Sequence, residues 1–165
     1  LLRQSPRTER VSGSLGGLLA GYILLDSQAG WKLTMTLLAD GKQSIAERIA
    51  AIGTVRFFQA THPKEARSAI LRCCQAVIRQ GELADLAIED LRRWGWWDLS
   101  PDVFASLSET PNPPPILRRG VVRYALSCPD ASAQAFLTRM RQSDPKLVAS
   151  VEESLKLYES VPKKP

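Results

Sequence analysis

The sequence has one histidine, three cysteines and no long apolar run. With only His62 available, the usual zinc sites and histidine-based catalytic triads are hard to assemble. Cys73, Cys74 and Cys128 show neither the CxxC spacing of redox and zinc sites nor a disulfide framework, so we expect them to be small buried side chains. No stretch reaches the roughly 18 consecutive apolar residues of a membrane-spanning helix, so no membrane span is expected.

Short motifs that mark common enzyme classes are also missing. The sequence contains no GxxxxGKS/T phosphate loop, no HExxH zinc motif and no GxSxG nucleophile motif. Its carboxylate pairs, Glu89-Asp90 and Glu152-Glu153, are adjacent in sequence, and adjacent side chains on a helix point about 100° apart. Because neither pair converges on one point, we expect a protein that is not an enzyme and needs no cofactor or metal.

The alternation of apolar and polar residues that marks β-strands is nearly absent, whereas helix signals recur at short intervals. Ser44 and Glu47 have the spacing of a capping box. Ser100-Pro101 and Asp144-Pro145 each place a capping residue before a proline at the first helical position. Helix ends are expected at Gly81, Gly95 and the prolines of 111–115. These signals predict an all-α protein with helices over residues 14–25, 30–39, 45–60, 63–79, 83–94, 101–109, 115–127, 130–142 and 145–159.

A five-residue unit recurs within this helical pattern. GTVRF at 53–57 and GVVRY at 120–124 are 67 positions apart, close to twice a 33-residue repeat. Paired helices at that period predict an α-solenoid of about four hairpins plus a C-terminal helix, in which each hairpin covers the apolar face of the next. We expect one domain over residues 14–160, with a flexible lead-in at 1–13 and a tail at 161–165.

The recurring unit places arginine on the apolar side of two helices. The repeat between them carries Asp90 at the matching position, so Arg56, Asp90 and Arg123 are expected to form a ladder of alternating charge along the stack. The alternative is that the arginines bind a ligand or a phosphate. Gly53 and Gly120 are expected to let a neighbouring helix approach closely.

The paired helices, the GTVRF and GVVRY units and the alternation of Arg with Asp resemble HEAT-like repeat proteins over about residues 14–160. Within that class, LADLAIEDLRRWGWWDL (83–99) and PPILRRGVVRYALSCPD (114–130) are similar to uncharacterised repeat proteins of planctomycete-type bacteria. The resemblance implies helical repeats, often in a cell-envelope or secreted setting, and no assigned activity.

The segment RRWGWWDLSP (92–101) concentrates three of the four tryptophans. Most of this apolar area has to be buried, either against the adjacent repeat or under a bound base, sugar or partner side chain. Trp97 or Trp96 is expected to be the exposed member of the three. The candidate partner-binding residues are Trp96, Trp97, Arg92, Arg93, Arg118 and Arg119.

Two functions fit this pattern. The first is a protein-interaction scaffold, which needs no special residues. The second is a nucleic-acid-binding module similar to HEAT-like DNA glycosylases, which hold DNA on a basic concave surface with tryptophans and an acidic residue; Asp90 and Asp98 are the candidate acids. The formal charge of +5 and the pI near 9.4 permit a polyanionic partner. Because the arginines alternate with acids, as in IEDLRR, the sequence favours the scaffold.

Overall fold

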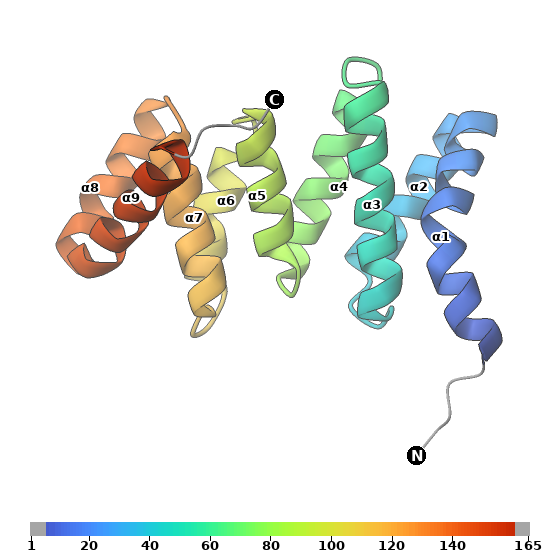
Figure 1. Ribbon diagram of the computed structural model, residues 1–165, viewed down its shortest axis with the longest axis horizontal. Coiled ribbons are helices and arrows are strands. Elements are labelled where there is room, and N and C mark those ends of the chain that lie inside the picture. Colours follow the sequence, from blue (N-terminus) through green and yellow to red (C-terminus); the bar gives the residue numbers. More distant parts are fainter. Residues whose placement is uncertain (1–5, 161–165) are drawn as a thin grey trace. The chain divides into compact units, whose positions relative to one another are not determined.

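The computed structural model describes the backbone of residues 6–160 and the side chains of residues 14–157. The helices in this range are α1 (Pro6–Leu25), α2 (Ser27–Ala39), α3 (Ile45–Thr61), α4 (Arg67–Gln80), α5 (Ala84–Trp94), α6 (Ser100–Glu109), α7 (Pro115–Ser127), α8 (Ala131–Ser143) and α9 (Pro145–Ser160) (Figure 1). No strand occurs in the described residues. The predicted all-α class is therefore confirmed.

Local capping chemistry sets several helix boundaries as predicted. The Ser44 hydroxyl accepts from the Glu47 amide at 3.2 Å, and the Glu47 carboxylate accepts from the Ser44 amide at 3.0 Å, so the capping box starts α3. Asp144 accepts from the amide of Leu147 at 3.1 Å at the start of α9. Gly95, at φ 67°, ends α5 in the left-handed conformation that glycine adopts without strain.

Other boundaries differ from the prediction. The helix expected over 63–79 begins only at Arg67, because His62, restricted by the following proline, is non-helical and residues 63–65 form a turn. Ser100 does not cap α6; it lies inside the helix, and its hydroxyl donates to the carbonyl of Trp97 at 2.7 Å. The first helix begins at Pro6 rather than at residue 14.

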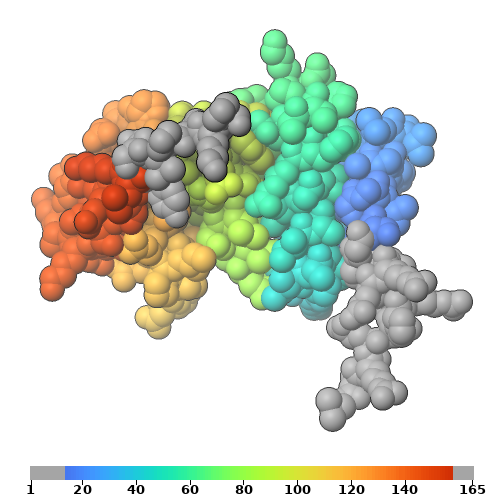
Figure 2. Space-filling view, in the orientation of Figure 1, coloured from blue at the N-terminus to red at the C-terminus, as the bar shows by residue number. Residues whose placement is uncertain are grey.

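The chain divides into two compact units, Leu1–Glu82 and Leu83–Pro165, called unit 1 and unit 2. In unit 1, α1 packs beside α3 and α2 packs beside α4, which gives two layers of helices (Figure 1). Side chains of α1 and α3 meet on the face of unit 1 that is turned toward the viewer in Figure 2. In unit 2, α7 packs against α5, α6, α8 and α9, and α6 also packs against α8.

Two glycines allow the close helix packing in unit 1. A Cβ at Gly30 would lie 2.7 Å from Ile23 of α1, and a Cβ at Gly16 would lie 3.1 Å from the carbonyl oxygen of Ala50. The glycines that the sequence suggested for this role are the wrong ones. A Cβ at Gly53 or Gly120 would meet nothing within 4 Å in the described structure.

The three cysteines are free and buried, as predicted. Cys73 and Cys74 lie in α4 of unit 1, and Cys128 follows α7 in unit 2. The sulfur of Cys128 lies 3.7 Å from the hydroxyl of Ser100, and each of the three cysteines is at most 4% exposed. The thiols are thus part of the packed interior.

Candidate functional site

The tryptophan-rich turn after α5 belongs to the core of unit 2. Trp96, one of the two candidates for the exposed tryptophan, is 7% exposed, while Trp94 and Trp97 are half-buried. The buried Tyr124 of α7 holds this turn: its hydroxyl donates to the carbonyl of Trp96 at 3.2 Å and lies 3.1 Å from the hydroxyl of Ser100. Burial raises the pKa of Tyr124 to about 12. This leaves Trp97, whose ring centroid is 5.0 Å from that of Tyr124, as a partly available surface.

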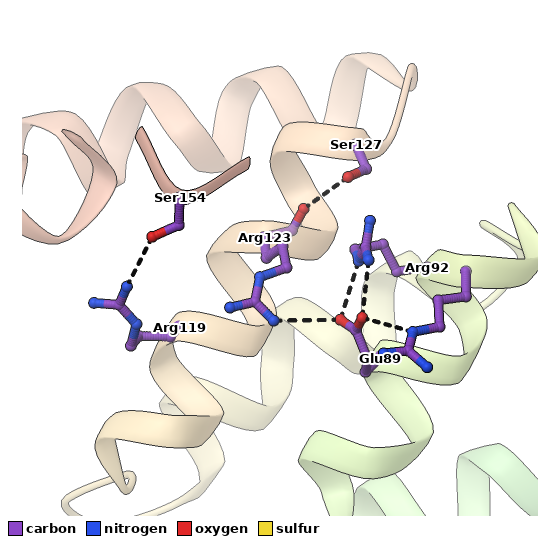
Figure 3. Close-up of polar contacts among 7 residues, drawn as sticks. Glu89, Arg92, Arg119, Arg123, Ser127 and Ser154 are labelled. Carbon is purple, nitrogen blue, oxygen red and sulfur yellow. Dashed lines mark hydrogen bonds and ion pairs between the residues drawn. The ribbon is translucent and has the colours of Figure 1, made fainter. Parts of the chain in front are cut away.

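A carboxylate surrounded by arginines joins α5 to α7 (Figure 3). Glu89 accepts two hydrogen bonds from Arg92, at 2.8 and 3.0 Å, and one from Arg93 at 2.9 Å. From α7, the guanidinium of Arg123 lies 3.6 Å from the same carboxylate. Arg93 is 68% exposed, whereas the side chains of Glu89, Arg92 and Arg123 are between 22% and 27% exposed. Three guanidinium groups, two from α5 and one from α7, thus surround one carboxylate.

The arginines keep Glu89 ionised. Partial burial by itself raises the pKa of this carboxyl, but hydrogen bonds and charge from Arg92, Arg93 and Arg123 outweigh burial and hold the pKa at about 2. Glu89 is thus a permanent anion at neutral pH. It stabilises the contact between α5 and α7.

The structure shows the surroundings of the three residues expected to form the charge ladder, Arg56, Asp90 and Arg123. Arg123 makes its ion pair with Glu89, the residue before Asp90. Asp90 is 6% exposed in α5, and Arg56 is exposed on α3 rather than buried on an apolar face. Because Arg56 belongs to unit 1 and Asp90 to unit 2, a contact between them stays a prediction.

Arg118 and Arg119 point to different parts of α9, although they are adjacent in α7. Arg118 donates to Asp144 at 2.6 Å, at the start of α9. Arg119 donates to the hydroxyls of Ser150 and Ser154 on α9, at 3.1 and 3.3 Å; Figure 3 shows Arg119 and Ser154 facing each other. Of the candidate arginines, Arg118 and Arg119 thus join α7 to α9, whereas Arg92 and Arg93 contact Glu89 within α5.

Replacing Glu89 with glutamine should remove an acid-dependent part of the stability. The folded-state pKa of about 2 is below the ordinary 4.5, so the contribution of Glu89 is full above pH 4.5 and is lost as the pH falls toward 2. We expect Glu89→Gln to lower the free energy of unfolding by at most about 3 kcal/mol at pH 7, with the difference from wild type closing between pH 4.5 and 2. Urea denaturation across that range measures the effect, with the exposed Glu109→Gln as the matched control. A difference that is the same at pH 7 and pH 2.5 would contradict the assignment.

An open groove lies between α2 and α4 in unit 1. It has a volume of about 530 Å³. Its lining residues are Ser27, Gln28, Trp31, Lys32, Met35, Glu65, Ser68, Ala69, Arg72 and Cys73. The half-buried Trp31 forms one wall and packs against Phe58, with 5.1 Å between ring centroids. Sequence reasoning missed this groove; its only trace in the sequence is the four-residue spacing of Trp31 and Met35 on α2.

The helices that border this groove carry only basic charge. Within Ser27–Ala39 and Arg67–Gln80 there is no aspartate or glutamate. The ammonium of Lys32 makes no hydrogen bond or ion pair with any residue of 14–157, and Arg72 donates to the neutral hydroxyl of Ser68 at 2.8 Å. Glu65 is the one acidic residue in the lining. The groove therefore combines an apolar wall with cationic groups that have few intramolecular partners.

The thiol in the groove lining is not suited to nucleophilic chemistry. Burial raises the pKa of Cys73 to about 12, and the nearby Arg72 only partly opposes this effect. At neutral pH the sulfur is protonated, and a thiol is a far weaker nucleophile than a thiolate. The groove is thus suited to binding rather than to covalent catalysis.

Unit 2 has two adjoining hollows with volumes of about 470 and 400 Å³. The first is lined by α6, α8, the connection before α7 and Arg118 of α7, and the second by α6 and α8 alone. The two hollows share Leu107 and Met140 in their linings, and the stacked rings of Phe104 and Phe136, 4.6 Å apart, border the second. Arg139 is exposed at its edge. Each unit therefore has a groove lined partly by apolar side chains, between α2 and α4 in unit 1 and between α6 and α8 in unit 2.

Sites of other kinds are missing from the described residues. No group of three or more His, Cys, Asp or Glu side chains within this part of the chain is placed to hold a metal ion. None of the described helices combines the length and apolar character needed to cross a membrane.

The fold and the grooves define an all-α protein made of two compact units with layered helices. No known protein family matches the sequence, and no curated protein or solved structure is significantly similar to it.

Proposed function

We propose that this chain is a non-enzymatic, HEAT-like helical-repeat scaffold that binds a protein partner. Support for the repeat comes from the packing of alternate helices inside each unit: α1 beside α3, α2 beside α4, α5 beside α7 and α6 beside α8. In a repeat protein this arrangement lets each hairpin bury the apolar face of its neighbour. The proposal includes the continuation of the two units as one α-solenoid.

The binding role rests mainly on the two grooves, one between α2 and α4 and one between α6 and α8. Concave surfaces with apolar and aromatic linings and a few polar groups are the usual places where proteins bind ligands or partner side chains. The α2–α4 groove presents Trp31 and Met35, and the α6–α8 groove presents Phe104, Phe136 and Met140. No special catalytic group is needed for this role.

Filling the grooves tests the proposal. Ser68 and Ser108 are residues of the two linings with accessible side chains, so Ser68→Trp and Ser108→Trp block the grooves without removing core side chains. Ser132→Trp, on an exposed position outside the linings, is the matched control. With the chain as bait in an extract of its source cells, wild type and the control should capture the same proteins, and at least one groove variant should lose them. Capture that is unchanged in both groove variants, or no capture by wild type, would overturn the proposal.

One observation favours a nucleic-acid-binding role as the second candidate. Residues 1–82 contain eleven lysines and arginines against six aspartates and glutamates, so the entire formal charge of +5 lies in this half of the sequence. A protein that neutralises several phosphates loses affinity steeply as salt rises. Duplex DNA binding across a salt series tests this candidate, and no measurable binding at low salt would end it.

A further inference from the structure

We propose that the α2–α4 groove binds a peptide segment in which a large apolar residue is flanked by aspartate or glutamate. This inference depends on the proposed scaffold function and names the chemistry of the partner. It follows from two properties of the groove, an apolar wall and a border in which two cations, Lys32 and Arg72, outnumber the one carboxylate, Glu65.

The apolar part of the groove has the size and composition to take up side chains. Trp31 and Met35 come from α2, and Ala69 and Cys73 come from α4. A volume of about 530 Å³ lies within the range of small-ligand pockets, roughly 300–1,000 Å³. Trp31 is held in place by Phe58 behind it, so the wall is already formed before a ligand arrives.

The basic border selects the residues that flank the apolar anchor. Arg72 has five N–H donors, and within the described residues it donates only to the hydroxyl of Ser68. A guanidinium with free donors is suited to a bidentate contact with a carboxylate, and Lys32 on the opposite helix supplies a second charge. Because Glu65 is also part of the lining, the carboxylates of the peptide should lie beside Lys32 and Arg72 rather than beside Glu65.

A peptide fits this groove better than a nucleic acid does. The ring of Trp31 is half-buried and tilted by 60° against Phe58, so it offers a wall for an aliphatic side chain rather than a fully exposed plane for a base. The lining holds two cations and one carboxylate, whereas a phosphate backbone needs a longer row of cations. Duplex DNA is therefore the competing ligand in the test.

The experiment uses the whole 165-residue chain and four fluorescein-labelled peptides of about twelve residues, a length that spans such a groove in extended form. One peptide has two central leucines flanked by glutamates; the others replace the leucines with glycines, the glutamates with glutamines, or the glutamates with lysines. In fluorescence anisotropy we expect the first peptide to bind at about micromolar Kd and the other three to bind at least about tenfold more weakly. Equal binding of the acidic peptides with leucine and with glycine would overturn the proposal, because the groove would then act only as a charged surface.

Charge reversal places the peptide in the groove. The double variant Lys32→Glu and Arg72→Glu should weaken binding of the acidic leucine peptide at least about tenfold. The double variant Lys146→Glu and Lys156→Glu, at positions of α9, makes the same change in net charge and should leave the Kd within about twofold. None of the four side chains is part of the buried core, so each variant should fold, and a thermal unfolding curve of each variant is the check.

Two further outcomes would contradict the acidic-peptide proposal. If both double variants weaken binding equally, net charge and not the groove determines the affinity. If duplex DNA binds and the acidic leucine peptide does not, the basic border serves a nucleic acid. Should the peptide fail while Ser68→Trp still loses the captured cellular proteins, the scaffold function stands and only the acidic-peptide assignment falls.

Discussion

Replacing Glu82 with glutamine is expected to destabilise the protein by about 3 kcal/mol. Arg48 of α3 is 2% exposed and donates to the carboxylate of Glu82, which follows α4. Among the residues with described side chains, Nε and Nη1 of Arg48 have no hydrogen-bond partner. Removing the carboxylate therefore leaves a buried cation without its counter-charge. Because Glu82 is 48% exposed, water replaces part of the lost interaction, and we expect the low end of the usual range of about 3–5 kcal/mol.

Replacing Arg48 itself should change the stability little, in contrast to the loss expected for Glu82→Gln. Arg48→Met keeps an unbranched side chain in the same space and removes both the desolvated charge and the two unsatisfied donors. We expect a change in stability within about 1 kcal/mol of wild type, of either sign. The double variant with Glu82→Gln should be as stable as Arg48→Met alone, because glutamine no longer faces a buried cation.

Urea unfolding of the two single variants and the double variant measures this thermodynamic cycle. If Arg48→Met lowers the free energy of unfolding as much as Glu82→Gln does, the ion pair is a net source of stability. The desolvation penalty of the guanidinium is then smaller than the favourable free energy of its contact with Glu82. The result also shows whether Arg48 adds to the free energy of folding, or only provides a specific contact between α3 and the end of α4 without adding stability.

Substitution of two helix-interior glycines by alanine should change the stability in opposite directions. At Gly30 the added methyl group would lie 2.7 Å from the backbone and side chain of Ile23, so α1 and α2 have to move apart. We expect Gly30→Ala to cost about 2 kcal/mol, since overpacking exceeds the gain in helix propensity. At Gly53 the methyl group meets nothing within 4 Å and φ is ordinary, so Gly53→Ala should add up to about 1 kcal/mol.

Thermal and urea denaturation of the two variants and of Gly120→Ala measures these effects. Gly120 is buried, unlike Gly53, but a Cβ there would likewise meet nothing within 4 Å, so its variant should also be stabilised. A stabilised Gly30→Ala would show that α1 and α2 separate easily, and a destabilised Gly53→Ala would show that this face of α3 is covered in solution.

Features set by neighbours along the chain can be predicted from the sequence. The capping box of Ser44 and Glu47, the glycine ends at Gly81 and Gly95, and the start of α7 at Pro115 are all of this kind, because each depends on a few consecutive residues. The same local reasoning fails at Ser100, where the hydroxyl bonds back to Trp97 instead of capping. A serine has several possible partners, and its choice depends on how the turn packs.

Features that join distant segments cannot be predicted in this way. The α2–α4 groove brings together two helices that are separated by the whole of α3, and the clash that forbids a side chain at Gly30 depends on the crossing of two helices. The sequence offers Trp96 as a surface residue, but Tyr124 draws the turn into the core. Even the similar units GTVRF and GVVRY differ: the aromatic ring is exposed at Phe57 and buried at Tyr124, since different helices surround α3 and α7.

The buried sulfurs provide a natural reporter for each half of the molecule. Cys73 and Cys74 belong to unit 1 and Cys128 to unit 2, and all three are reduced and shielded in the folded state. An alkylating reagent can reach them only when the surrounding helices open, so mass spectrometry of the labelled fragments gives separate opening rates for the two units. Equal rates would mean that the units unfold together, and unequal rates would identify the half that opens first.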